Sequence, residues 1–411
     1  MKKKLIPLLL SLAMLAACLS GCGSTAKVEI TESPAPTEAP SAAQDTPAAE
    51  APASAEAPEE TMDPEEAARM ARYQAAYEKY EPDRTVLLVN GEPVTWSQYY
   101  SWIYDIASQM ETAYEITDWN EARDELADVV SDASFGSFVC GTALSYVTQI
   151  EIIRQKAAEL GVTLTEAQRD EINATIDGYA ENLGGQEALE QLLADNYITM
   201  DYFREQNEAM LLINSLYEKL YGEEGKNLSD EDAVAYMKDN SYLYAKHILF
   251  RTVDDSNEPI PEEEAAQKKA EAEEVMAQLR AAEPDELATL FDSLMKQYSE
   301  DTGLLSYPDG YYFLSGEMVP EFEKAATALE ENGLSDIVET SYGYHILFRP
   351  PMSGDHIMGY DSNYTPYTIR AFVSSALFDN VAGEWYDEAE RTALYVNGFE
   401  DLDLNELFGV G

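Results

Sequence analysis

The chain has 411 residues, of which 78 are acidic and 26 are basic, and its formal net charge is −52. A polypeptide with this charge is repelled by nucleic-acid phosphates and by anionic lipid headgroups, which argues against a nucleic-acid-binding protein. Only three cysteines are present, two of them within the first 22 residues, so the sequence offers neither a disulfide framework nor a cysteine metal cluster.

The first residues have the pattern of a secretory signal peptide: three lysines after Met1, an apolar run from Leu5 to about Leu15, and then small residues. The run is too short for a transmembrane helix. Two tetrapeptides that end at Cys18 and Cys22 resemble the lipobox of bacterial lipoproteins, in which the cysteine is lipidated. We favour Cys22, because small polar residues follow it as a tether would, and Cys18 is the alternative. An ordinary secreted protein with unrelated cysteines is a third interpretation.

Changes of composition along the chain predict five segments. Residues 1–21 are expected to be the signal peptide, and residues 22–64 a disordered linker, because they are rich in proline, alanine and glutamate and lack aromatic residues. Residues 65–240 have the pattern of a helical domain. Residues 241–350 differ in pattern and are expected to form a separate domain. Residues 351–411 are expected to pack back on the N-terminal domain.

The N-terminal domain is expected to begin with a short hairpin and continue as helices. Thr85–Val89 has strand character, Asn90–Gly91 predicts a tight turn, and Thr95 with Gln98 resembles a capping box that opens a helix. Apolar residues then recur with helical spacing up to about residue 240. The aromatic residues at 96–119 are expected in the core; the alternative is a concave surface that holds unfolded chains.

The pentapeptide His-Ile-Leu-Phe-Arg occurs twice, at residues 247–251 and 345–349. Both copies are β-branched and aromatic, which predicts two strands. Because side chains alternate on a strand, each histidine shares a face with leucine and arginine. If the strands are neighbours, both histidines lie on one face of a sheet. The competing interpretation is two ordinary core strands, each with a histidine satisfied locally.

Four motifs around these strands resemble parvulin-type peptidyl-prolyl isomerases, in the family's order and spacing. They are Tyr244–Phe250, Gln297–Asp301, Phe313–Ala326 and Thr340–Leu347. The resemblance implies a small antiparallel sheet flanked by helices over residues 241–350. One stretch departs from the family: Ser306–Phe313 replaces most of a glycine-rich loop that borders the substrate groove, which bears on efficiency and residue preference.

The resemblance also implies the parts of an active site. Met318 and Phe322 would form an apolar cup for the proline ring, with Phe313 supporting it. Because Met318 and Phe322 lie four residues apart, an ordinary core face of one helix would also account for them.

The polar part of the implied site comes from four other residues. His247 and His345 would form a hydrogen-bonded pair, and Thr340 would hold it. Asp301 would act as an electrostatic group near the carbonyl that swings. The alternatives are structural support for the histidines and a loop cap for Asp301. His356 lies beyond the motifs and is expected to be an ordinary surface residue. Bond rotation needs no metal and no cofactor, and no third ligand with suitable spacing accompanies the two histidines.

The C-terminal segment shows helical spacing over residues 366–392, followed by Leu394–Gly398, which echoes Leu87–Gly91. We expect these two segments to lie side by side and the helix to pack on the N-terminal bundle. This layout resembles PrsA-like and SurA-like extracytoplasmic foldases. It implies an α+β chain, with a mainly helical chaperone domain built from both chain ends and an inserted parvulin domain.

The sequence therefore predicts a foldase that is lipid-anchored to the outer face of the bacterial cell membrane. It would bind unfolded, newly exported polypeptides that contain proline and catalyse cis/trans isomerisation of X–Pro bonds. The alternative is a holdase chaperone whose parvulin domain is weakly active or inactive, an interpretation that the altered loop at 306–312 keeps open. A solute-binding lipoprotein is disfavoured, because it would need two α/β lobes. A homodimer is left open.

Overall fold

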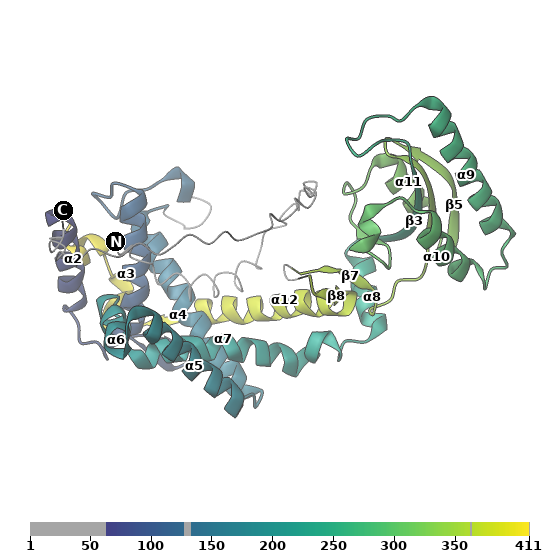
Figure 1. Ribbon diagram of the computed structural model, residues 1–411. Coiled ribbons are helices and arrows are strands. Elements are labelled where there is room, and N and C mark those ends of the chain that lie inside the picture. The colour runs from purple at the N-terminus through teal and green to yellow at the C-terminus, as the bar shows by residue number, and fades with distance from the viewer. Residues whose placement is uncertain (1–62, 127–132, 362–363, 411) are drawn as a thin grey trace, which may run out of the picture. The chain divides into compact units, whose positions relative to one another are not determined.

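A computed structural model describes residues 63–126, 133–361 and 364–410 (Figure 1). The chain divides into two compact units. The first consists of residues up to 159, residues 164–212 and residues from 383 onward, and the second of residues 160–163 and 213–382. The expected signal peptide, the linker, Cys18 and Cys22 lie outside the described residues. None of the described helices combines the length and apolar character needed to cross a membrane. The functional domain boundaries at 240/241 and 350/351 stay a prediction.

The first unit is mainly helical, as the spacing of its apolar residues predicts. Its elements are α2 (Pro64–Tyr77), β1 (Thr85–Val89), β2 (Glu92–Thr95), α3 (Trp96–Ala113), η1 (Asp124–Leu126), α4 (Phe135–Glu159), α5 (Glu166–Leu183), α6 (Gln186–Asp195), the first part of α7 (Met200–Tyr221), the last part of α12 (Ile369–Thr392), β9 (Leu394–Tyr395), η4 (Phe399–Asp401) and α13 (Leu404–Phe408). Helix α3 begins at the predicted capping box of Thr95 and Gln98.

The C-terminal residues complete a three-stranded sheet of order β2-β1-β9. Strand β9 runs antiparallel to β1, with Leu87 opposite Tyr395 and Leu88 opposite Leu394. The amide of Val396 also donates to the carbonyl of Val86 at 2.9 Å. The predicted pairing of the two similar segments is therefore confirmed, and the first unit is built from both ends of the described chain.

The aromatic residues of α3 belong to the core of this unit. Trp96, Tyr99, Tyr100 and Trp102 are at most 3% exposed. The C-terminal segment adds to the same core, since Phe399 packs on Trp96 at 5.4 Å between ring centroids. The alternative of an exposed aromatic surface built by these four side chains is wrong, because their rings are used to join α3 to its neighbours.

The second unit contains an antiparallel sheet with helices on both faces (Figure 1). Its elements are the last part of α7, η2 (Glu223–Gly225), α8 (Asp230–Asp239), β3 (Leu243–Arg251), α9 (Glu262–Ala281), α10 (Leu287–Tyr298), η3 (Thr302–Leu305), β4 (Tyr311–Phe313), α11 (Pro320–Ala328), β5 (Gly333–Thr340), β6 (Gly343–Arg349), β7 (Ile357–Tyr360), β8 (Pro366–Thr368) and the first part of α12. The order β4-β3-β6-β5 places the two pentapeptide strands at the centre. The predicted α+β class is confirmed.

The two faces of this sheet carry different residues, as alternation along β3 and β6 requires. Ile248, Phe250 and their counterparts in β6 pack against α9 and α10 in one apolar cluster. On the other face, Ala245 and Leu347 pack with Phe313 and Phe322, the latter from α11. The histidines lie on this second face, so α11 and the loops beside it border them.

The C-terminal contribution to the first unit can be tested at Phe408, which is 3% exposed and packs on Tyr73 and Trp119. Phe408→Ala should lower the free energy of unfolding of the first unit by about 3–5 kcal/mol, because it leaves a cavity in the core. Leu394→Ala is the control, since Leu394 is 63% exposed in the same segment. Urea unfolding followed by tryptophan fluorescence measures both. Equal stability of the two variants would show that the C-terminal segment does not complete this core.

Candidate functional site

The register of β3 and β6 brings the two histidines together. His247 pairs with Leu347 and Leu249 pairs with His345, so the histidines are diagonal neighbours on one face. Their Nδ1 atoms are 3.0 Å apart, and the rings lie nearly parallel with centroids 5.2 Å apart. Both residues are buried. Two nitrogens at this distance form a hydrogen bond only if one is protonated and the other is not.

Hydrogen bonds extend from the histidine pair at both ends. On one side His345 Nε2 lies 2.8 Å from Thr340 Oγ1, which itself accepts from the amide of Tyr342 at 3.1 Å. On the other side His247 Nε2 lies 2.8 Å from Asp301 Oδ2. The structure thus joins the four polar residues named by the sequence in one chain, Thr340–His345–His247–Asp301.

The charge states of His345 and Asp301 place most of the protons in this series of hydrogen bonds. Burial, with a smaller contribution from His247, lowers the pKa of His345 to about 3, so His345 is neutral at pH 7. Asp301 is ionised and can only accept, which places a proton on His247 Nε2. His345 then either donates from Nδ1 to His247 or accepts there and donates to Thr340. The two arrangements differ by one proton, and both leave Asp301 as an accepting carboxylate.

Asp301 is held by three donors. His247 Nε2 and the Tyr311 hydroxyl donate to Oδ2 at 2.8 and 2.6 Å, and the amide of Gly303 donates to Oδ1 at 2.9 Å. Burial alone would raise the pKa of Asp301, but the hydrogen bond and charge of His247, with the bonds from Tyr311 and Gly303, lower it to about 2. Asp301 also caps η3, so it serves the loop and contacts the histidine pair at once.

Tyr311 is a site residue that the sequence motifs did not reveal. It lies opposite Ala245 in β4, within the loop region that departs from the family pattern. Its hydroxyl reaches Asp301 because residue 303 is glycine: a Cβ there would lie 2.0 Å from the hydroxyl oxygen. Burial, then the charge of Asp301, raises the pKa of Tyr311, so the phenol stays a neutral donor. The replacement of the usual glycine-rich loop by tyrosines was the available signal.

The altered loop keeps a tight turn through Gly310, whose φ is +99°. A side chain at this position would also lie 2.9 Å from the carbonyl oxygen of Ala245. Glycine is therefore needed for both backbone conformation and close approach. The turn directs Tyr311 toward Asp301 and lets Tyr312 stack on Tyr244 with ring centroids 4.2 Å apart.

The apolar side of the site is formed by aromatic rings around His247. The edge-to-face contacts are 5.2 Å to Phe322 and 5.5 Å to Tyr311 between ring centroids. Phe322 also contacts His345 at 5.7 Å and Phe313 at 5.9 Å. Phe313 and Phe322 are buried, so in this structure they form the floor beneath the site, as core residues would.

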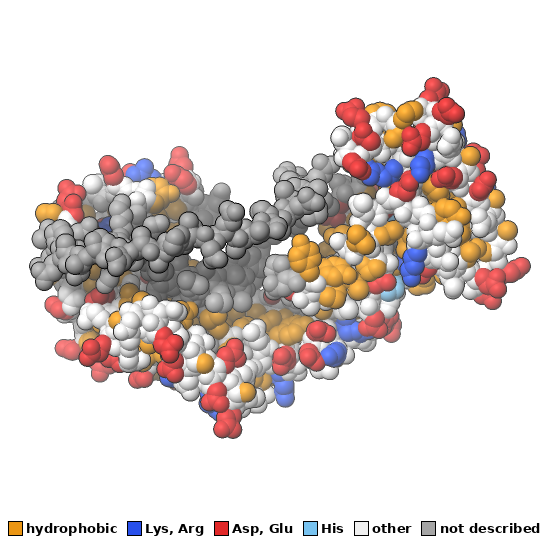
Figure 2. Space-filling model, in the orientation of Figure 1, with side chains coloured by type: hydrophobic (Ala, Val, Ile, Leu, Met, Phe, Trp, Pro, Cys, Tyr) orange, Lys and Arg blue, Asp and Glu red, His pale blue; other side chains and the backbone are white. Residues whose placement is uncertain are grey.

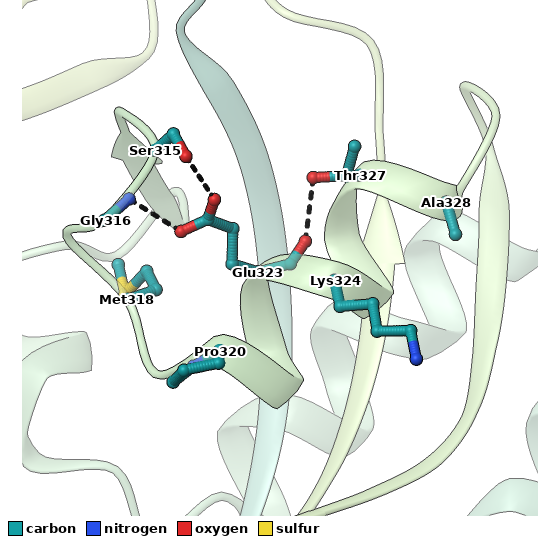
Figure 3. A pocket seen from close by; sticks show the side chains of 8 residues that line it. All are labelled: Ser315, Gly316, Met318, Pro320, Glu323, Lys324, Thr327 and Ala328. Carbon is teal, nitrogen blue, oxygen red and sulfur yellow. Dashed lines mark hydrogen bonds between the residues drawn. The ribbon is translucent and has the colours of Figure 1, made fainter.

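Met318 is half-buried above this floor and lines a separate open pocket of about 640 Å³ on the outer side of α11 (Figure 3). In Figure 3 the carboxylate of Glu323 turns to Ser315 and Gly316, from which it accepts two hydrogen bonds. These bonds fix the turn that carries Met318. The structure therefore places all three residues expected to form the proline cup in one cluster, with only Met318 near the surface.

The expectation that His356 is an ordinary surface residue is wrong. Its Nδ1 lies 2.6 Å from the hydroxyl of Tyr312, and its ring centroid is 5.4 Å from that of Tyr244. Asp309 also accepts from the amide of Ile357 at 2.9 Å. These contacts tie β7 to the altered loop, a tertiary relation that sequence position alone does not indicate. Within the described ranges, no group of three metal-ligating side chains could hold an ion.

Comparison with known proteins points to one family for this region. The family model described as "Rotamase: PPIC-type PPIASE domain" matches residues 247–349, which include both histidines. The foldase protein PrsA of Caldanaerobacter subterraneus subsp. tengcongensis is 26% identical over 311 residues, covering 75% of this chain and 85% of the relative. PrsA of Oceanobacillus iheyensis is 26% identical over 230 residues, covering 55% of this chain and 62% of the relative, less than two thirds of its length. The crystal structure of PrsA from Bacillus subtilis is 21% identical, with 80% of this chain and 100% of that chain covered and a TM-score of 0.24.

The hydrogen bonds to Asp301 predict that the effect of Tyr311→Phe on the free energy of unfolding depends on pH. The pKa of Asp301 is depressed in the folded chain, so its contribution to stability is present above the unfolded value of about 3.9 and is lost as the pH falls toward 2. Removal of the phenol oxygen should cost about 1 kcal/mol at pH 7, and the difference from the native chain should shrink between pH 5 and pH 2. Tyr307→Phe, which alters a neighbouring phenol with no hydrogen bond to Asp301 recorded among the described residues, is the control. A pH-independent difference in urea unfolding would contradict this account of Asp301.

Proposed function

Because residues 247–349 form a PPIC-type peptidyl-prolyl isomerase domain, we propose that the whole chain is an extracytoplasmic foldase anchored to the outer face of the cell membrane. It binds unfolded exported polypeptides and accelerates cis/trans isomerisation of their X–Pro bonds. The observation that carries the proposal is the hydrogen-bonded series Thr340–His345–His247–Asp301, which ends in an ionised carboxylate and whose His247 contacts the ring of Phe322.

The reaction needs a site that weakens amide resonance. Rotation about the peptide bond meets a barrier of about 18–20 kcal/mol, because the planar amide shares its nitrogen lone pair with the carbonyl. In the planar forms this sharing increases the negative charge on the carbonyl oxygen, and in the twisted form that charge is reduced. A site that binds the twisted form more tightly than either planar form lowers the barrier.

Asp301 suits this task as a fixed negative charge. A carboxylate near the swinging carbonyl oxygen repels it more in the planar forms than in the twisted form, so it favours the transition state. The three donors that lower the pKa of Asp301 keep it ionised and oriented, at no reorganisation cost during rotation. His247, His345 and Thr340 act as positioning residues, because their hydrogen bonds fix the carboxylate from below.

Phe322, Phe313 and Met318 supply the apolar partner for the proline ring. An apolar surrounding also disfavours the charge-separated planar amide relative to the twisted one, so the same rings that hold the substrate assist rotation. Met318 near the surface and Phe322 below it would grip the ring once the substrate enters.

The proposed location rests on the secretory signal pattern, with Cys22, or alternatively Cys18, as the lipidated residue. Two relatives carry the name foldase protein PrsA, which supports polypeptides that are still folding as the substrate class; that these polypeptides are exported follows from the signal pattern. The negative charge keeps the folded part soluble and repels anionic lipid headgroups, so attachment would depend on the acyl chains.

A holdase with a weak isomerase site is the second candidate function, and one observation favours it. The hydroxyl of Tyr311 donates a hydrogen bond to Asp301 Oδ2 at 2.6 Å, so part of the carboxylate is already engaged. Tyr311 belongs to the stretch that replaces the glycine-rich loop usual in the family. A holdase would protect unfolded clients from aggregation without accelerating proline isomerisation, whereas the foldase does both.

Phe322→Leu tests the isomerase site, with Phe291→Leu as the matched control. Both phenylalanines are at most 3% exposed in the same unit, but Phe291 belongs to α10 and packs on the opposite face of the sheet. Each substitution should cost about 1–2 kcal/mol of stability. Only Phe322→Leu should lower kcat/KM for a short Ala–Pro peptide, by about tenfold, because only Phe322 borders the histidines. Equal activity of the two folded variants in a protease-coupled assay would place the cup elsewhere.

A further inference from the structure

Large exposed side chains, two tyrosines and one leucine, lie on segments that adjoin the proposed isomerase site. Tyr364, which precedes β8, is 86% exposed, and Tyr367 in β8 is 36% exposed. Leu305 is 86% exposed in η3, which Asp301 caps. Figure 2 shows hydrophobic side chains gathered over β7 and β8. Large apolar side chains in one exposed area of a strongly charged protein indicate a binding surface rather than incidental exposure.

Ring contacts connect this surface to the proposed catalytic residues. The ring of Tyr311, whose hydroxyl holds Asp301, lies 5.1 Å from that of Tyr307 between centroids. The same loop is joined to β7, because Asp309 accepts a hydrogen bond from the amide of Ile357 at 2.9 Å. Strand β7 in turn pairs with β8, with Gly359 opposite Tyr367. Tyr367 is itself positioned over Gly359 of β7, where a Cβ would lie 2.7 Å from its hydroxyl oxygen. Ring contacts therefore lead from Phe322 past His247 and Tyr311 to Tyr307, and hydrogen bonds join the loop that carries Tyr307 to β7 and so to β8.

We propose that Leu305, Tyr307, Tyr364 and Tyr367, called the apolar strip, bind the apolar segment of an unfolded polypeptide that flanks the proline at Asp301. This inference rests on the proposed function for its occupant. A polypeptide chain that places one proline beside Asp301 must leave the site along a neighbouring surface, and the strip adjoins it. Tyrosine rings hold apolar side chains at low entropic cost and without reading a sequence, which suits a site for many clients.

The net charge disfavours the other occupants of such a surface. A second copy of the chain would carry the same formal net charge of −52 and would be repelled, and an anionic lipid surface would be repelled in the same way. An uncharged apolar peptide meets neither obstacle. The strip itself contains no charged side chain, so it would bind peptide segments according to the apolar area that they bury against it.

The experiment uses the full chain and two fluorescent peptides with the same central Ala–Pro, one continued by serine and glycine and the other by leucine and phenylalanine. In the strip variant Leu305, Tyr364 and Tyr367 are each replaced by serine. It should bind the apolar peptide about tenfold more weakly than the native chain and bind the serine–glycine peptide unchanged. Tyr114→Ser is the control, because Tyr114 is 41% exposed in the other unit. Its affinity should equal that of the native chain.

Unchanged affinity of the strip variant for the apolar peptide, or an equal loss for both peptides, would overturn the inference. The double variant Leu305→Ser, Tyr364→Ser removes only the two most exposed side chains, so it keeps the test valid if the triple variant does not fold. The rate of cis/trans exchange of the Ala–Pro bond, measured on the same samples, separates the isomerase proposal from the strip proposal. Strip-dependent binding without accelerated exchange would refute the isomerase function alone. Accelerated exchange with strip-independent binding would refute the strip alone.

Discussion

The pairing of β3 with β6 is the constraint on which the site depends. Each strand carries the same pentapeptide, and the antiparallel register sets His247 and His345 diagonally opposite with their Nδ1 atoms 3.0 Å apart. A slip of one residue would turn one histidine to the face covered by α9 and α10 and would leave its partner with an unsatisfied buried nitrogen. The apolar cluster of Ile248 and Phe250 opposes such a slip. Core packing on one face therefore fixes the polar chain on the other.

The polar chain ends at a loop whose conformation is set by small residues. Gly310 takes a positive φ beside Ala245, and Gly303 leaves room for the hydroxyl of Tyr311. These two glycines let an otherwise aromatic loop approach Asp301. The result is a carboxylate with three donors, which is well suited to stay ionised but shares one oxygen with a phenol. The altered loop therefore has a chemical consequence at the site, because its Tyr311 donates a hydrogen bond to the carboxylate of Asp301.

Much of this arrangement could be predicted from sequence because it depends on periodicity and repeated motifs. The histidine pair, the faces of β3 and β6, and the pairing of Leu394 with Leu88 all follow from alternation or from similarity between distant segments. Tyr311 and His356 could not be predicted in this way. The direction of each side chain depends on a turn or a tertiary contact, and neither leaves a periodic pattern. The aromatic residues of α3 are the intermediate case, since composition favours a core over a binding surface and only packing decides between them.

The central claim is that the charge of Asp301 favours rotation of the X–Pro bond, and Asp301→Asn tests it most directly. The substitution keeps the shape of the side chain and removes its charge. Asp336→Asn is the control, because Asp336 is 89% exposed in β5. Cis/trans exchange of an Ala–Pro peptide, measured by exchange NMR with the intact chain, should be accelerated by the native chain and the control. It should slow by about 10²-fold or more with Asp301→Asn, the order of effect seen for one electrostatic group in a preorganised site. Equal exchange with a folded Asp301→Asn variant would contradict the account.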